Sequence, residues 1–135
     1  MKATTKPVWI LVADSSTARL FSAENSASDL IEIETLNYAD MYLTDQRVAN
    51  DVPDVLDKEH VETHFAKRVV KHLNKELNHN KFERLFIVAA PSFLGSLRGE
   101  FNNRIEKQVS FSLGKNIVNL PPSKIRSHLP HSLAS

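Results

Sequence analysis

The chain contains no cysteine, which excludes disulfide bonds, thiolate metal ligands and cysteine nucleophiles. Glycine is almost as scarce, and three glycines are too few for a Walker loop or a dinucleotide fingerprint. No apolar run approaches the ~20 residues that span a bilayer, and the run near the N-terminus is too short for a secretion signal. These absences predict a cytoplasmic protein with no membrane span and no cofactor.

Excess charge of one sign is also lacking. Seventeen lysines and arginines nearly balance sixteen aspartates and glutamates, so any affinity for nucleic acid must come from local clustering. The apolar fraction of 41% is typical of a globular protein with a buried core. A length of 135 residues predicts one domain over residues 1–135, in which residues 1–7 form a flexible tail.

Three strands are predicted in the first part of the chain. Residues 8–13 are continuously apolar, as in a strand buried on both faces. The turn-forming residues 14–16 end this strand, and residues 17–21 follow at once, which predicts a hairpin. Residues 30–36 alternate Ile and Thr with acids, the two-residue period of a half-exposed strand. Residues 37–57 show no sustained period and are predicted to form a long loop.

A helix of about twenty residues is the clearest predicted element. Its apolar positions recur every four residues, at Val61, Phe65, Val69, Leu73 and Leu77. It ends near residues 78–80, where asparagine tolerates a left-handed cap. A buried strand at 85–90, a helix at 92–103, a strand at 109–113 and a helix from Ser123 to about residue 129 complete the pattern. The order β-β-β-α-β-α-β-α predicts an α/β fold with a mixed sheet that has an antiparallel meander at one side.

Two motifs resemble a known family. Residues 12–21 read VADSSTARLF, and residues 82–98 read FERLFIVAAPSFLGSLR. Together they resemble the two signatures of the bacterial host-attachment protein family, and the resemblance covers nearly the whole chain, from about residue 9 to 129. That family is similar to the middle domain of archaeal and eukaryotic peptide-chain release factors and of the ribosome-rescue protein Pelota.

The resemblance implies a three-layer, ribonuclease-H-like domain, a ribosome or a tRNA as partner, and a link to attachment to host cells. Release factors present a Gly-Gly-Gln tripeptide on a loop to hydrolyse peptidyl-tRNA. The corresponding loop here, residues 42–57, contains Gln46 but no glycine. Without glycine the backbone cannot readily present such a glutamine, and this departure argues against peptidyl-tRNA hydrolysis.

Candidate binding residues lie where the two motifs leave their strands, because ligands of open α/β sheets usually bind at strand ends. Asp14 and Arg19 either close the hairpin turn and pair with a nearby acid, or take part in binding. Arg98, one helical turn after Gly95, forms either a salt bridge or a phosphate contact that is assisted by a helix N-terminus near Ser92.

The polar side of the long helix carries Lys67, Arg68, Lys71 and Lys75, away from the acids that concentrate between residues 24 and 62. Such a run is either a solvated face or a surface for a phosphate backbone. Aromatic residues are not interleaved with it, so stacking on single-stranded bases is not predicted.

No catalytic set and no metal site are predicted. His60 and His64 are four residues apart, but no glutamate directly follows the first, as a zincin requires. Ser92 lacks the flanking glycines of a nucleophile elbow.

The leading hypothesis is a non-catalytic binding domain that contacts ribosomal RNA or tRNA phosphate. One alternative is a protein-interaction or regulatory module that affects attachment through its acidic loop, residues 40–57. Another is a metal-dependent hydrolase that combines Asp14 with loop carboxylates, for which the candidates are Asp45, Asp51 and Asp54.

Overall fold

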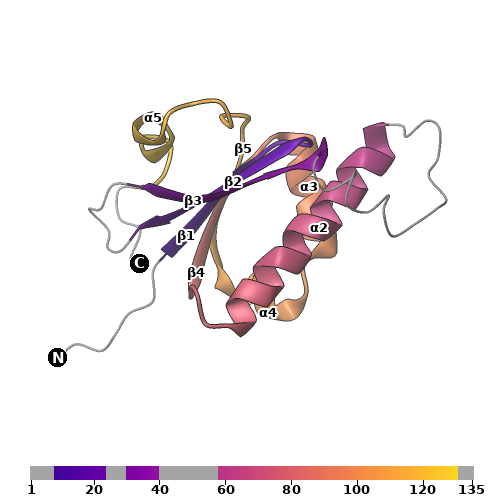
Figure 1. The fold of residues 1–135 in the computed structure, drawn as a ribbon, viewed down its shortest axis with the longest axis horizontal. Coiled ribbons are helices and arrows are strands. Elements are labelled where there is room, and N and C mark those ends of the chain that lie inside the picture. Colours follow the sequence, from indigo (N-terminus) through magenta and orange to yellow (C-terminus); the bar gives the residue numbers. More distant parts are fainter. Residues whose placement is uncertain (1–7, 24–29, 40–57, 131–135) are drawn as a thin grey trace.

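The computed structural model describes residues 8–23, 30–39 and 58–130 of the chain, with side chains from residue 61 onward in the last range. In these residues five strands form one sheet, in the order β3-β2-β1-β4-β5 (Figure 1). The strands are β1 (Val8–Ala13), β2 (Thr17–Ala23), β3 (Ile31–Asn37), β4 (Arg84–Ala89) and β5 (Val109–Gly114).

The sheet is mixed, as the sequence predicts. β2 runs antiparallel to both β1 and β3, whereas β4 runs parallel to both β1 and β5. The predicted hairpin of β1 and β2 is thereby confirmed, and the second fully apolar strand, β4, lies beside β1. Both central strands are buried because helices cover the two faces of the sheet.

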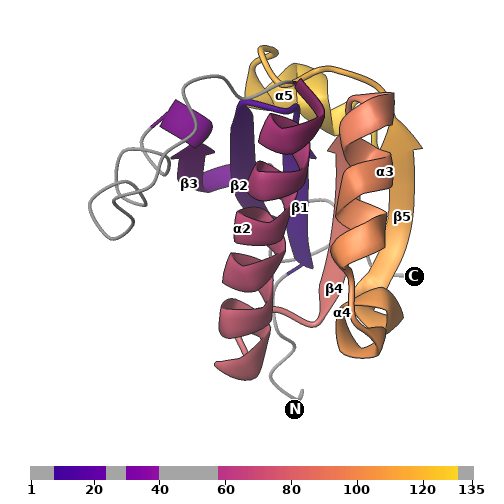
Figure 2. The ribbon, with the colours of Figure 1, turned by 90° about the vertical axis from the view of Figure 1, so that its right-hand side faces the viewer.

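Helices lie on both faces and complete three layers. Figure 2 shows α2 and α3 side by side across one face, with α4 below α3 and α5 on the far side. The first face packs Phe65, Leu73 and Phe93 against β1 and β4, and the second packs Ile125 against Phe21 and Phe86. The helices are α2 (Lys58–Asn78), α3 (Pro91–Glu100), α4 (Asn103–Gln108) and α5 (Pro122–Arg126).

The predicted element order differs from the observed one at 92–103, where the single expected helix is two helices. α3 ends at Glu100, and the following residue, Phe101, has an extended backbone (φ −66°, ψ 138°). The side chain of Asn102 then accepts a hydrogen bond from the Ile105 amide at 2.9 Å and caps α4. Asparagine at this position starts a new helix more readily than it continues an old one.

The predicted pattern of β3 was also too simple. Its isoleucines, Ile31 and Ile33, are 56% and 43% exposed, so they do not form the buried side of the strand. The register of β3 against β2 shifts between Leu20 and Phe21, and this irregularity breaks the strict alternation. β3 is an edge strand, where one side of the ladder has no neighbour in the sheet.

Three predicted boundaries move. Asn37 belongs to β3 and residues 38 and 39 are helical, so of the predicted loop only residues 40–57 remain, and they lie outside the described residues. α5 begins at Pro122, with Pro121 as its N-cap, one residue before the predicted start at Ser123, and it ends at Arg126 instead of about residue 129. The left-handed residue expected at the end of α2 is present, since Asn80 has φ 58°.

Among the described residues, no helix combines the length and hydropathy needed to cross a bilayer.

Candidate nucleic-acid interface

The two motifs meet at one rim of the sheet, as their positions on neighbouring parallel strands require. Ala13 at the end of β1 is in register with Ala89 at the end of β4, and the Ala90 amide donates to the Ala13 carbonyl at 3.1 Å. Asp14 and Pro91 therefore leave the sheet side by side. This rim also holds Tyr38, whose amide donates to the Ser16 carbonyl at 2.8 Å.

Asp14 holds the hairpin turn closed. Its carboxylate accepts hydrogen bonds from the amides of Ser16 and Thr17, both at 2.9 Å, and from the Ser16 hydroxyl at 3.1 Å. This is the turn in which an aspartate satisfies the backbone donors of the residues that follow it. The geometry accounts for Asp14 without a ligand.

Arg19 is engaged within the fold. Its guanidinium donates to both oxygens of Glu32 on β3, at 3.2 and 2.9 Å, and to the carbonyls of Val118 and Leu120, both at 2.7 Å. The hydrogen bond from Arg19, followed by that from Thr35, lowers the pKa of Glu32 below its ordinary value. Arg19 thus ties the edge strand and the segment before α5 to β2, and four of its five N–H donors are used.

Ser92 opens α3, but a carboxylate occupies the place where a phosphate would bind. The Ser92 hydroxyl donates to Glu62 of α2 at 2.8 Å, and Glu62 is only 8% exposed. The N-cap of α3, Ala90, makes no side-chain cap, and the hydrogen bond from Ser92 holds the Glu62 carboxylate beside the first turn of this helix, where negative charge is favourable. A second anion at this position would be repelled.

The outer surface of α2 carries a straight lysine row, which we define as Lys67, Lys71 and Lys75. All three side chains are exposed, and none makes an ion pair within the residues that the structure describes. Consecutive members are one helical turn apart, about 6 Å along the axis. No acid lies three or four residues from any of them, so the row is self-repelling, which costs folding a few tenths of a kcal/mol per neighbouring pair.

Arg68 and His72 lie on the flank of α2 that faces β3. The His72 ring nitrogen is 2.7 Å from a Glu34 oxygen, and Arg68 also makes contacts within the protein. Arg68 is therefore less available to a partner than the lysine row.

The neighbouring surface of α3 is smooth. Gly95 and Gly99 lie on its exposed side, and a Cβ at either position would meet no atom within 4 Å. Close packing inside the protein therefore does not explain these glycines, although each one weakens a helix by about 1 kcal/mol relative to alanine. Arg98 points to the other flank of α3 and donates to the Ser112 hydroxyl of β5 at 2.5 Å.

The predicted binding residues do not form one site. The lysine row and the α3 glycines share one outward face, Arg98 flanks it, and Asp14 and Ser92 lie at the rim. Arg19 lies on the opposite side of the sheet, and Gln46, Asp51 and Asp54 lie outside the described residues. Sequence reasoning did not predict that Glu62 is buried beside Ser92. The available signal was helical spacing, since Glu62 lies three residues before Phe65 of the apolar stripe and so shares its face of α2.

The described residues contain no group of three His, Asp or Glu side chains placed to hold a metal ion.

Two solved structures are distantly similar to the chain. An Aquifex aeolicus member of the Ppx/GppA family aligns with a TM-score of 0.40 and 18% identity, over 79% of this chain and 35% of that one. Saccharomyces cerevisiae Dom34, described as a translation termination-like factor involved in RNA quality control that interacts with Hbs1, aligns with a TM-score of 0.44 and 13% identity, over 90% and 34%. Likeness at this level does not carry a function across.

Comparison with sequences is more informative. A protein of Rickettsia prowazekii (strain Madrid E), itself described as uncharacterised, is 38% identical over 64 residues, which are 46% of this chain and 41% of that protein. The chain thus covers less than half of that curated relative. Residues 9–129 match the family described as "Protein required for attachment to host cells". Since this match includes both motifs and every described element except the first residue of β1, the chain belongs to the family of proteins required for attachment to host cells.

Proposed function

We propose that this domain binds structured RNA of the translation machinery, on the ribosome or on tRNA, and that it does so without catalysis. The observation that carries the proposal is the lysine row on α2, which is exposed, has no ion-pair partner in the described residues and repels itself. A surface that weakens folding is best explained by a partner of opposite charge. The description of the family ties it to attachment to host cells, and the proposal adds a biochemical activity to that role.

The shape of the surrounding surface supports a nucleic-acid backbone as the partner. The lysine row extends for about 12 Å along α2, and the exposed glycines of α3 lie on the same outward face. Lysine is a point charge that binds phosphate without demanding one geometry. A phosphate backbone can therefore lie along α2 while its sugars contact the smooth surface at Gly95 and Gly99. Arg98 then contributes a further positive charge on the far flank of α3.

Charge across the rest of the described chain points the same way. Residues 61–130 contain twelve lysines and arginines but only five acids. Of these five, Glu62 is buried against Ser92. Of the acids of β3, Glu32 pairs with Arg19, and Glu34 lies 2.7 Å from a ring nitrogen of His72. Attraction of a polyanion by this part of the chain follows from that imbalance.

The ribonuclease-H-like assignment and a cytoplasmic location belong to the same proposal. The mixed five-stranded sheet with helices on both faces is compatible with the first, and the second is where ribosomes and tRNA are found. The domain is proposed to comprise residues 1–135.

Sucrose-gradient sedimentation of the tagged protein tests the proposal. We expect wild-type protein to travel with ribosomal fractions at low salt and to move to the free fractions as salt rises. Protein that stays free in every fraction at low and moderate salt would overturn it. A pull-down with the tagged protein gives a second test. Recovery of protein partners without RNA would favour instead the interaction module that acts through residues 40–57.

A further inference from the structure

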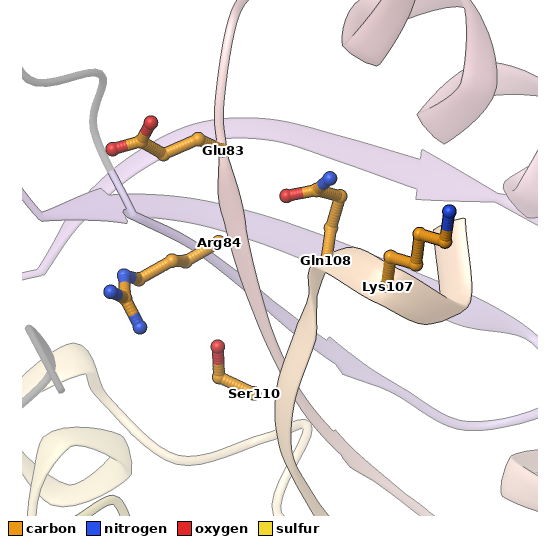
Figure 3. Close-up of a pocket in the computed structure, with 5 residues that line it drawn as sticks. All are labelled: Glu83, Arg84, Lys107, Gln108 and Ser110. Carbon is orange, nitrogen blue, oxygen red and sulfur yellow. The ribbon is translucent and has the colours of Figure 1, made fainter. Parts of the chain in front are cut away.

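A polar hollow lies at the rim of the sheet opposite the Asp14 turn. Its volume is about 320 Å³, and Glu83, Arg84, Lys107, Gln108 and Ser110 line it (Figure 3). These residues come from the start of β4, the end of α4 and the start of β5. Because β4 is parallel to β1, its first residues lie at the edge of the sheet away from Asp14.

An irregularity in the sheet lies beside this hollow. Leu85 pairs with Val109, but the next residue, Phe86, pairs with Phe111, so Ser110 has no partner in the ladder with β4. Such a bulge bends the strand and redirects a side chain. Here α4 passes directly into β5 at Gln108 and Val109, and the bulge follows at once.

The lining groups are those that recognise a phosphate ester with polar groups attached. Arg84 and Lys107 are cationic, Ser110 provides a hydroxyl, and Gln108 provides both a donor and an acceptor. Figure 3 shows the Arg84 guanidinium and the Ser110 hydroxyl directed to the same part of the hollow. Arg84 also makes contacts within the protein, but five N–H donors allow one guanidinium to hold a protein group and a phosphate together.

Glu83 distinguishes this hollow from a simple anion site. Its carboxylate lies at the edge of the hollow and can only accept hydrogen bonds when ionised. With the cations Arg84 and Lys107, the Glu83 carboxylate gives the hollow a net charge of +1. The carboxylate would repel a bare phosphate that approached it closely. A nucleotide offers it base amino groups or ribose hydroxyls, and a volume of about 300 Å³ is at the lower end of small-molecule sites.

We propose that this hollow binds the terminal phosphate and the first nucleoside of a 5′-phosphorylated nucleotide. Arg84 and Ser110 hold the phosphate, and Lys107 adds long-range attraction. Gln108 and Glu83 hydrogen-bond the ribose or the base. The ligand is either a free 5′-mononucleotide or the 5′ end of an RNA strand, which present the same chemistry. This site goes beyond the proposed ribosome binding and does not depend on the lysine row.

Titration of the ¹⁵N-labelled full chain, followed by NMR, tests the site. The probes are a 5′-mononucleotide, a short RNA with a 5′-phosphate, the same RNA with a 5′-hydroxyl, and inorganic phosphate. We expect saturable shifts of the Gln108 side-chain amide and of the backbone amides around Ser110 with at least one of the first two probes. Response to the mononucleotide identifies a free nucleotide as ligand, and response to the phosphorylated RNA alone identifies a strand end.

Variants assign the response to the hollow. Arg84→Gln should weaken nucleotide binding about tenfold and Ser110→Ala about fivefold, as expected for a charged and a neutral hydrogen bond. Lys81→Ala removes an exposed lysine that does not line the hollow and should change affinity less than about twofold. If Arg84→Gln fails to fold, Ser110→Ala still decides the matter.

Three results would overturn the proposal. The first is the absence of saturable shifts with both phosphorylated probes at millimolar concentration. The second is equal binding of inorganic phosphate and the nucleotide, and the third is full affinity in the Ser110→Ala variant. Replacing the lysine row with alanine should leave nucleotide binding intact, so failure of this site and failure of ribosome binding are separate results.

Discussion

Replacement of the lysine row by alanine, in a Lys67→Ala, Lys71→Ala, Lys75→Ala variant, should weaken RNA binding and flatten its salt dependence. If each lysine neutralises one phosphate, the three contribute about −2 to the slope of log affinity against log salt. A rise from about 50 to about 200 mM salt would then lower the RNA affinity of the wild type about 20-fold through the row alone. At the lower salt, a loss of about 0.7 kcal/mol of binding free energy for each of the three exposed contacts should make the variant bind RNA about 30-fold more weakly than the wild type.

Fluorescence anisotropy with labelled tRNA and with a ribosomal RNA fragment measures both quantities. The matched control is a Lys81→Ala, Lys115→Ala, Lys124→Ala variant, which removes the same charge from exposed lysines outside the row. Alanine is the best helix former, and the row repels itself, so the row variant should be at least as stable as the wild type. Equal weakening by the two variants would refute the reasoning, because net charge and not the row would then determine binding.

Four further changes test contacts within the fold and the exposed glycines of α3. Arg19→Met should lower the free energy of unfolding by about 2–4 kcal/mol in urea denaturation, because it leaves Glu32 and two carbonyls without their donor. The Glu32 contribution is complete above pH 4.5 and is lost as pH falls through the lowered pKa. The stability difference between wild type and Glu32→Gln should therefore shrink towards about pH 3, and a constant difference would contradict this. Glu62→Gln should cost about 1–3 kcal/mol in the same assay, since the Ser92 hydroxyl and the α3 N-terminus lose their carboxylate; an unchanged midpoint would argue against this cap. Gly95→Ala with Gly99→Ala should raise the thermal midpoint, by about 0.4–1 kcal/mol of stability each, yet weaken ribosome binding, and undiminished binding would remove these glycines from the interface.

The sequence predicts the sheet well because its information is local in β1, β4 and α2. Two fully apolar runs and one four-residue apolar repeat define the central strands and the main helix. The hairpin follows from Asp14 and the serines after it, which close a turn by their own hydrogen bonds. The meeting of the two motifs at one rim then follows from parallel pairing.

What could not be predicted depends on contacts between distant residues. Arg19 donates hydrogen bonds to carbonyls about a hundred residues later in the chain, and no sequence pattern predicts such a partner. Glu62 accepts a hydrogen bond from Ser92, thirty residues further along the chain. Asn102 is a typical N-cap residue and could have predicted the break between α3 and α4. The helical spacing of apolar residues continues across the break, however, and it favoured a single helix.

Residue-specific cross-linking to purified ribosomes tests the central claim most directly. Because the chain has no cysteine, Lys71→Cys and Lys124→Cys variants can each carry one photoreactive label, the first on α2 and the second on α5 across the sheet. The account predicts adducts to RNA from position 71 and few or none from position 124. Adducts from position 124 alone, or equal yields from both positions, would contradict it.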